Sequence, residues 1–239
     1  MSFQTTIEID GQQIKTLQDI FPQPGKAKML IIGKRPTPDS VEVGHYFQGA
    51  QGQYFWLCLK ESGLLALDPN KHKYEDEALL EHGFGITDFV KRPGRYKQEP
   101  SEDEYQLGAV RIKGEIARLQ PKALLFVYKR PLNWLVRYGY NSKLRIDFGF
   151  NPHLETLFGS PCKVFLFCAD YGEQMTWCDN RVNKSMSDIQ IRPLSPRTEG
   201  SFYGRFCHTS NFVTPHTSAA AGPQPGAGPH VPAKQRLRS

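Results

Sequence analysis

Short apolar runs, each ended by a glycine, a proline or a polar loop, most strongly constrain how this chain can fold. Residues 29–32 form the clearest run, because Gly33 ends it and a proline-rich loop follows. Runs of this kind are typical of buried strands. Similar runs occur at 123–127 and 164–167, and 85–90 is a shorter candidate that leads into a basic loop.

Segments with helical spacing separate these runs. Apolar residues recur on one face in 53–64, and 74–81 and 131–138 are further short candidates. Ser101 with Glu104 three residues later forms a capping box, which predicts the start of a longer helix. Helices that alternate with buried strands favour a mostly parallel sheet covered on both faces.

Composition narrows the possible partners and compartments. The net charge of +6 suits a polyanionic partner such as nucleic acid. We expect no membrane association, because no apolar stretch approaches the about 18 residues that a span needs, and we expect no secretory signal. The five cysteines lack C-x-x-C spacing, which favours a reduced protein and disfavours a zinc or iron–sulfur site.

Changes in composition divide the chain into three predicted regions. They are an N-terminal extension and linker (1–26), an α/β domain (27–172) and a divergent, largely disordered C-terminal segment (173–239). The Ala-, Gly- and Pro-rich stretch 219–239 is too poor in apolar residues to order itself. The change in character after Phe167 also fits a shifted reading frame or a truncated gene.

Four motifs follow one another in a recognisable order. They are Gly-x-x-Pro at 33–36, Gly-His-Tyr-Phe at 44–47, Phe-Trp at 55–56 and the segment 85–93. Together they resemble the uracil-DNA glycosylase superfamily, most closely its mismatch-specific uracil/thymine branch. The resemblance covers about 28–167 and implies a three-layer α/β/α fold with a central, mostly parallel four-stranded sheet, followed by an irregular tail.

The resemblance also implies an activity. Such an enzyme of base-excision repair flips uracil, or a mismatched or deaminated base, out of double-stranded DNA and hydrolyses its N-glycosidic bond. It implies a monomer with no metal or cofactor, located in the bacterial cytoplasm with the nucleoid or in a nucleus. The alternative is a catalytically impaired relative that binds DNA or a nucleobase. An unrelated nucleotide-binding domain is disfavoured, since no Gly-x-Gly-x-x-Gly or Walker loop is present.

Four residues are the candidates to bind the base. Phe47, or Tyr46 beside it, would stack on the base, and His45 with the backbone at Gly33 would contact the base or the attacking water. The simpler interpretation is a core strand followed by a structural loop.

Two residues are the catalytic candidates, and one departs from the family pattern. Arg35 stands where the family has a water-positioning asparagine, and arginine offers no hydrogen-bond acceptor, although its charge could stabilise an anionic leaving base. Asp39, four residues on, could hold the water instead. It could equally be an ordinary loop carboxylate or a helix cap.

Basic residues supply the candidate DNA contacts. Lys91, Arg92 and Lys129 could bind phosphates, or could simply form a solvated basic surface. The family's second motif, which presses into the DNA minor groove, is missing after 164–167. A better match lies downstream in 212–218, with His216 and Ser218 as candidates, although chance similarity explains it more simply.

Overall fold

The computed structural model describes residues 1–95, 97–158 and 162–167. The chain divides into two units, Met1–Arg197 and Thr198–Ser239, and every described residue lies in the first. The strands are β1 (Gln4–Ile9), β2 (Gln12–Leu17), β3 (Met29–Gly33), β4 (Phe84–Asp88), β5 (Ala123–Phe126), β6 (Gly149–Phe150) and β7 (Lys163–Leu166). The α-helices are α1 (Pro38–Val43), α2 (Ala50–Glu61), α3 (Glu102–Leu119) and α4 (Lys129–Trp134). Tighter or wider helical turns are η1 (Glu75–His82), η2 (Leu135–Gly139) and η3 (Pro152–Leu154).

The main sheet has five strands in the order β4-β3-β5-β7-β6. Its first four strands run parallel, so the predicted mostly parallel sheet is confirmed. The fifth strand, β6, pairs antiparallel with β7 over two residues only. The sequence predicted four strands and not this fifth one, because two residues carry no readable alternation.

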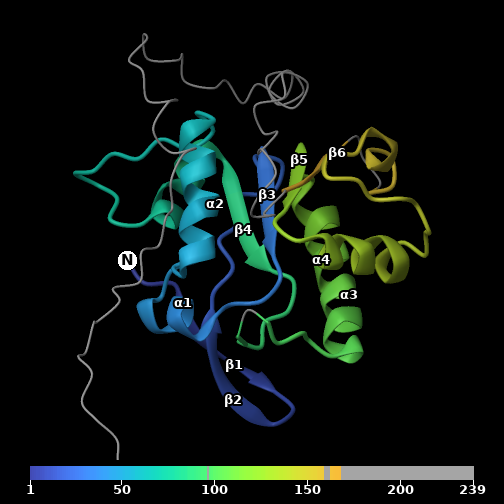
Figure 1. Cartoon of the computed structure of the whole chain (residues 1–239), viewed down its shortest axis with the longest axis horizontal. Coiled ribbons are helices and arrows are strands. Elements are labelled where there is room, and N and C mark those ends of the chain that lie inside the picture. Colours follow the sequence, from blue (N-terminus) through green and yellow to red (C-terminus); the bar gives the residue numbers. More distant parts are fainter. Residues whose placement is uncertain (96, 159–161, 168–239) are drawn as a thin grey trace, which may run out of the picture. The chain divides into compact units, whose positions relative to one another are not determined.

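Helices cover both faces of this sheet, which gives the expected three layers (Figure 1). Alternate residues of a strand point to opposite faces. Ile31 of β3 therefore shares one buried cluster with Phe55 of α2, and its neighbour Ile32 shares another with Ile112 of α3. This placement of α2 and α3 leaves the carboxyl edge of the strands free for a site.

Local signals in the sequence explain where several helices begin and end. The side chain of Ser101 accepts a hydrogen bond from the backbone of Glu104, and the Glu104 side chain accepts one from the Ser101 N–H, so the predicted capping box is present. The η1 turn ends at Gly83, whose φ of 73° favours glycine. The predicted helix at 131–138 becomes α4 and then the wider π turn η2.

The first 26 residues are part of this fold rather than a separate extension. Strands β1 and β2 form a hairpin that packs against α1, where the Phe3 N–H donates to the Gly44 carbonyl over 2.8 Å. Ile20 then exchanges two backbone hydrogen bonds with Ile86 of β4. The C-terminal segment predicted at 173–239 lies outside the described residues.

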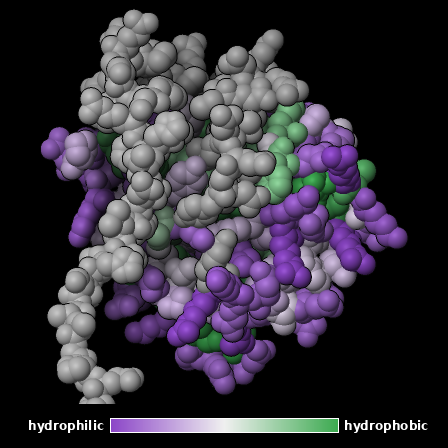
Figure 2. Space-filling model, in the orientation of Figure 1, coloured by the Kyte–Doolittle hydropathy of each residue, from purple (hydrophilic) through white to green (hydrophobic). Residues whose placement is uncertain are grey.

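The described surface is largely hydrophilic in the view of Figure 2, with small hydrophobic areas between the charged side chains. Among the described helices, none combines the length and the apolar content that crossing a membrane requires.

Candidate active site

A cavity of about 580 Å³ lies at the carboxyl edge of the parallel strands. Asp88 ends β4, Tyr128 follows β5, the loop after β3 forms one wall, and the first turn of α2 forms another. Ligands of open parallel sheets bind at this edge. The lining residues are Leu17, Arg35, Pro36, Thr37, Pro38, Asp39, Ser40, Phe47, Gly49, Ala50, Gln51, Gly52, Asp88, Arg95 and Tyr128.

Gly33 lies against Asp88 and Phe47, two of the residues that line the cavity. It pairs in register with Asp88 of the neighbouring strand, so the two residues face the same side of the sheet. A Cβ atom on Gly33 would lie 2.2 Å from Asp88 Oδ1 and 3.1 Å from the ring of Phe47. The missing side chain therefore lets a carboxylate and an aromatic ring meet at the cavity.

Asp88 is a buried carboxylate without a hydrogen-bond partner for either oxygen among the described residues. Buried polar groups are almost always hydrogen-bonded, so this exception points to function. Burial raises the pKa of Asp88 to about 7, and the negative charge of Asp19 raises it as well. The nearby cations Lys91, Arg111 and Arg35 act in the opposite direction, but burial outweighs them.

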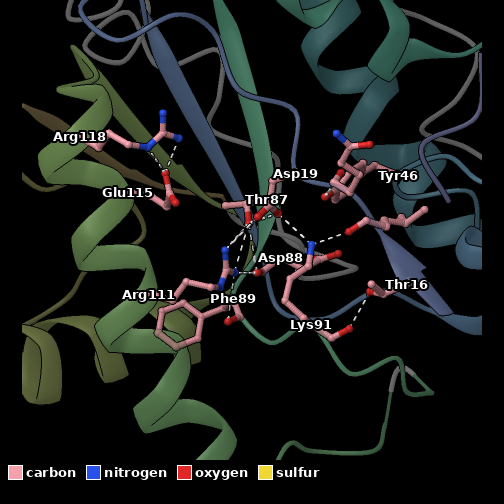
Figure 3. Close-up of polar contacts among 12 residues, drawn as sticks. Thr16, Asp19, Tyr46, Thr87, Asp88, Phe89, Lys91, Arg111, Glu115 and Arg118 are labelled. Carbon is pink, nitrogen blue, oxygen red and sulfur yellow. Dashed lines mark hydrogen bonds and ion pairs between the residues drawn. The ribbon is translucent and has the colours of Figure 1, made fainter. Parts of the chain in front are cut away.

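A network of charged groups lies beside Asp88 and holds the end of β4 in place (Figure 3). Asp19 accepts hydrogen bonds from Lys91 at 2.8 Å and from Arg111 at 3.1 Å. Arg111 also donates to the backbone carbonyl of Asp88 and to the Thr87 hydroxyl. The network thus fixes the backbone of Asp88 and leaves its carboxylate free to face the cavity.

Phe47 is held in an unusual backbone conformation beside the cavity. Its φ of 57° lies in the left-handed region, which is uncommon for a residue other than glycine and which clusters at functional sites. Its ring packs edge-on against Phe55, with centroids 5.1 Å apart. Gly52 lets the first turn of α2 lie close to the backbone of Phe47, because a Cβ on Gly52 would lie 2.2 Å from the Phe47 carbonyl oxygen.

His45 and Tyr46, expected to contact the base, lie in the protein interior instead. His45 Nδ1 is 2.8 Å from Asp76 Oδ1, and the ring stacks on Tyr74. Tyr46 is fully buried; its N–H donates to Asp76 and its hydroxyl donates to the Gln18 carbonyl. Neither is among the residues that line this cavity; both hold the loop that carries Phe47, and a contact of either residue with the base stays a prediction.

Arg35 lines the cavity, but its guanidinium group binds a neighbouring loop. Its Nε donates to the Arg92 carbonyl at 3.0 Å, and its Nη2 donates to the Pro93 carbonyl at 3.1 Å. Gly94 packs directly on this group, since a Cβ there would lie 2.4 Å from Arg35 Cζ. Arg35 therefore holds the loop at 92–94 in place, and its predicted catalytic role stays a prediction.

Asp39 lies in the first turn of α1 and is exposed at the edge of the cavity. Its proposed part in holding the water stays a prediction. The helix cap that the sequence allowed for Asp39 is instead Thr37, whose hydroxyl accepts a hydrogen bond from the Ser40 N–H.

The candidate DNA-binding residues separate into two groups. Lys91 pairs with Asp19 and donates to the Leu17 carbonyl, and Arg92 pairs with Asp10 and Glu104. Phosphate binding by either residue stays a prediction. Lys129 is exposed at the start of α4. His216 and Ser218 lie outside the described residues.

Metal binding finds no support in the part of the chain that the structure describes. No three histidine, cysteine, aspartate or glutamate side chains there gather in a way that could hold a metal ion.

Sequence reasoning missed Asp88 and Tyr128 as site residues. Each lies at or just after the carboxyl end of a predicted parallel strand, where ligands bind. A systematic inspection of strand ends would have found both. Only the structure shows that the Asp88 carboxylate has no hydrogen-bond partner within residues 1–95, 97–158 and 162–167.

The fold and the cavity define a three-layer α/β/α protein with a pocket at the carboxyl edge of its sheet. The family model of the uracil DNA glycosylase superfamily matches residues 21–222, most of the chain, and the chain belongs to this family. The match extends past Phe167, where the motif resemblance ended, and includes the segment 212–218 that the sequence analysis attributed to chance.

A curated relative supports the same placement. The chain is 31% identical over 98 residues to the G/U mismatch-specific uracil DNA glycosylase of Schizosaccharomyces pombe (strain 972 / ATCC 24843). The matched region is 41% of this chain and 30% of that protein, so the chain covers less than a third of the relative's length.

Proposed function

We propose that this protein is a DNA glycosylase that removes uracil, or another mismatched or deaminated pyrimidine, from double-stranded DNA. The observation that carries the proposal is the cavity beside Gly33, which is lined by two aromatic residues and a buried carboxylate. Family membership and the name of the yeast relative support this activity.

The cavity suits one flipped base. Phe47 and Tyr128 supply aromatic surface, and stacking on such surface offsets the cost of taking a base out of the duplex, which is a few kcal/mol. The first turn of α2 also lines the cavity, and Gly49 at its N-cap has no side chain to occupy the free N–H groups. Those donors can stabilise the negative charge that develops on a departing base.

Arg95 provides a cation at the edge of the same cavity. It is exposed and lines the cavity, whereas Lys91 and Arg92 are engaged in ion pairs. A phosphate flanking the flipped nucleotide is a suitable partner for its guanidinium group.

Incubation with a duplex that carries one G:U pair, followed by alkali to break abasic sites, tests the proposal. We expect strand scission at the uracil and release of free uracil, and no scission of the matched G:C duplex. Tight, salt-sensitive binding without scission would instead support the impaired relative considered from the sequence. Absence of both scission and binding, for G:U and for the other deaminated or mismatched pyrimidines, would contradict the proposal.

A further inference from the structure

Resting on the proposed glycosylase function, we propose that Asp88 is the catalytic residue that holds the attacking water and accepts a proton from it. Arg35 stands where the resemblance places an asparagine that positions the water. The assignment gives this role to Asp88, at the end of the neighbouring strand β4. Three observations carry it: where the carboxylate lies, what it lacks, and what the other cavity residues are doing.

The location comes from the register of two strands. Asp88 continues the row Phe84 and Ile86 on one face of β4, and it is the first polar residue of that row. It therefore stands where the buried core ends and the cavity begins. Gly33 beside it leaves the space into which Oδ1 projects, and the ring of Phe47 borders the same space. A base stacked near Phe47 would bring its glycosidic bond close to this carboxylate.

The carboxylate also lacks the partners that a structural role requires. Neither oxygen has a hydrogen-bond partner among the described residues, although Asp88 is only 1% exposed. A buried carboxylate without donors is costly, and a protein that kept it only for stability would be expected to supply donors. A bound water that donates a hydrogen bond to Asp88 would meet this need.

The other candidates in the cavity are less suited to the task. Arg35 has no acceptor, and its guanidinium group is bound to the loop at Arg92 and Pro93. Asp39 is the second carboxylate of the lining, but it is exposed on α1, where water competes for it. Asp88 is thus the carboxylate of the lining that is shielded from solvent.

The chemical step balances with water as the only co-reactant. The water oxygen forms a bond to C1′ of the deoxyribose as the bond between C1′ and the base nitrogen breaks. The electron pair of that bond leaves with the base, which becomes an anion. A proton of the water passes to an oxygen of Asp88 and from there to the base or to solvent, which restores the carboxylate.

The surroundings set when Asp88 can accept a proton. Lys91 and Arg111 favour its charged form, and Asp19, which pairs with both, disfavours it. The positive charge of Arg35 also lowers the pKa of Asp88, by less than Lys91 does. Burial, and then the negative charges of Asp88 and Asp19, raise the pKa of the Tyr46 hydroxyl. Burial dominates and raises the pKa of Asp88 to about 7, which suits a general base working near neutral pH.

The test compares wild type with Asp88→Asn, which keeps the shape but removes the charge and the basicity. Single-turnover cleavage of the G:U duplex is measured from pH 5 to 9, and affinity is measured with a duplex carrying 2′-fluoro-deoxyuridine, which resists cleavage. Asp103→Asn is the matched control, since Asp103 is exposed in the first turn of α3.

We expect the wild-type rate to rise with pH to a plateau, with a midpoint near 7. Asp88→Asn should cleave about 100-fold or more slowly at pH 8 and lose this rise, while its affinity for the fluorinated duplex stays within about twofold. The control should match wild type in cleavage rate, in pH dependence and in affinity for the fluorinated duplex.

Two results would overturn the assignment while leaving the proposed function intact. One is an active wild type with an Asp88→Asn variant that cleaves at the same rate. The other is a variant that loses affinity for the fluorinated duplex but cleaves bound substrate normally, which would make Asp88 a reader of the base. A wild type that cleaves no uracil duplex would overturn the glycosylase function itself, and this assignment with it.

Discussion

Two buried carboxylates, Asp76 and Asp88, show how differently the same chemical group is used in this molecule. Both are 1% exposed, and burial raises the pKa of each. Asp76 is paired with His45 and accepts a hydrogen bond from the Tyr46 N–H, whereas Asp88 has no hydrogen-bond partner among the described residues. The partnered group builds the loop, and the unpartnered group faces the cavity.

The comparison teaches that burial alone does not identify a functional residue. His45 and Asp76 form a histidine–aspartate pair of the kind found in active sites. Here Asp76 contacts the His45 ring and accepts a hydrogen bond from the Tyr46 N–H, so the pair holds one loop in place. Asp88 is inconspicuous in the sequence, but neither of its carboxylate oxygens has a hydrogen-bond partner among the described residues. An unsatisfied buried group beside a cavity is therefore the better guide to chemistry.

The largest expected loss of stability comes from removing Asp76. Asp76→Ala leaves the Tyr46 N–H and the His45 ring without their buried acceptor, so we expect about 3 kcal/mol of destabilisation. Denaturant unfolding monitored by tryptophan fluorescence measures it. Asp103→Ala, at an exposed position, should change the free energy of unfolding by less than about 0.5 kcal/mol. Equal effects of the two variants would deny Asp76 its structural role.

The next effect concerns the space that Asp88 occupies. Gly33→Ala places a Cβ 2.2 Å from Asp88 Oδ1, so the carboxylate must move, and we expect about 2 kcal/mol of destabilisation. Gly114→Ala in α3 is the matched control, since a Cβ there meets no atom within 4 Å and alanine favours helices. The control should be slightly stabilised. A neutral Gly33→Ala would mean that the carboxylate does not project into this space.

Asp88→Asn should stabilise the protein, in contrast to Asp76→Ala. Because burial raises the pKa of Asp88 to about 7, the protein loses stability as the pH rises from about 4 through 7 and the carboxylate ionises. The variant avoids that loss, so it should be more stable than wild type by about 4 kcal/mol at pH 8, because the pKa of Asp88 differs from its ordinary value by about 3 units at about 1.4 kcal/mol each, and equal to wild type near pH 4. Urea unfolding at both pH values measures the difference; a gain that is the same at both would refute the ionisation account.

The smallest effect concerns Arg35. Lysine cannot donate to the carbonyls of Arg92 and Pro93 from one planar group, so Arg35→Lys should cost about 1 kcal/mol and loosen the loop at 92–94. Hydrogen exchange at Gly94, whose N–H donates to the Pro36 carbonyl, reports this loosening. Unchanged exchange there would show that Arg35 does not hold the loop.

The sequence predicted the architecture well, because the signals for it are local. The apolar run of β3 and the capping box at Ser101 each lie within a few residues, and the structure has both. Of the residues expected to bind the base, Phe47 lines the cavity and Gly33 lies against Phe47 and Asp88; their contacts with a base stay predictions.

The remainder of the site depends on contacts between distant parts of the chain. Asp88 lies beside Gly33 because β3 pairs with β4. His45 lies in the interior, where it contacts Asp76 of η1. Neither contact leaves a trace in local spacing. Side chains two residues apart in one motif can therefore lie in different surroundings, as His45 and Phe47 show.

A carbon-13 NMR titration of the aspartate side-chain carboxyl groups, with Asp88→Asn used to assign the signal, tests the central claim most directly. The account predicts that Asp88 titrates near pH 7 in the free protein, because its carboxylate is buried and receives no hydrogen bond from the residues that the structure describes. A titration midpoint near the ordinary value of 3.8 would contradict it, since the carboxylate would then be solvated or hydrogen-bonded.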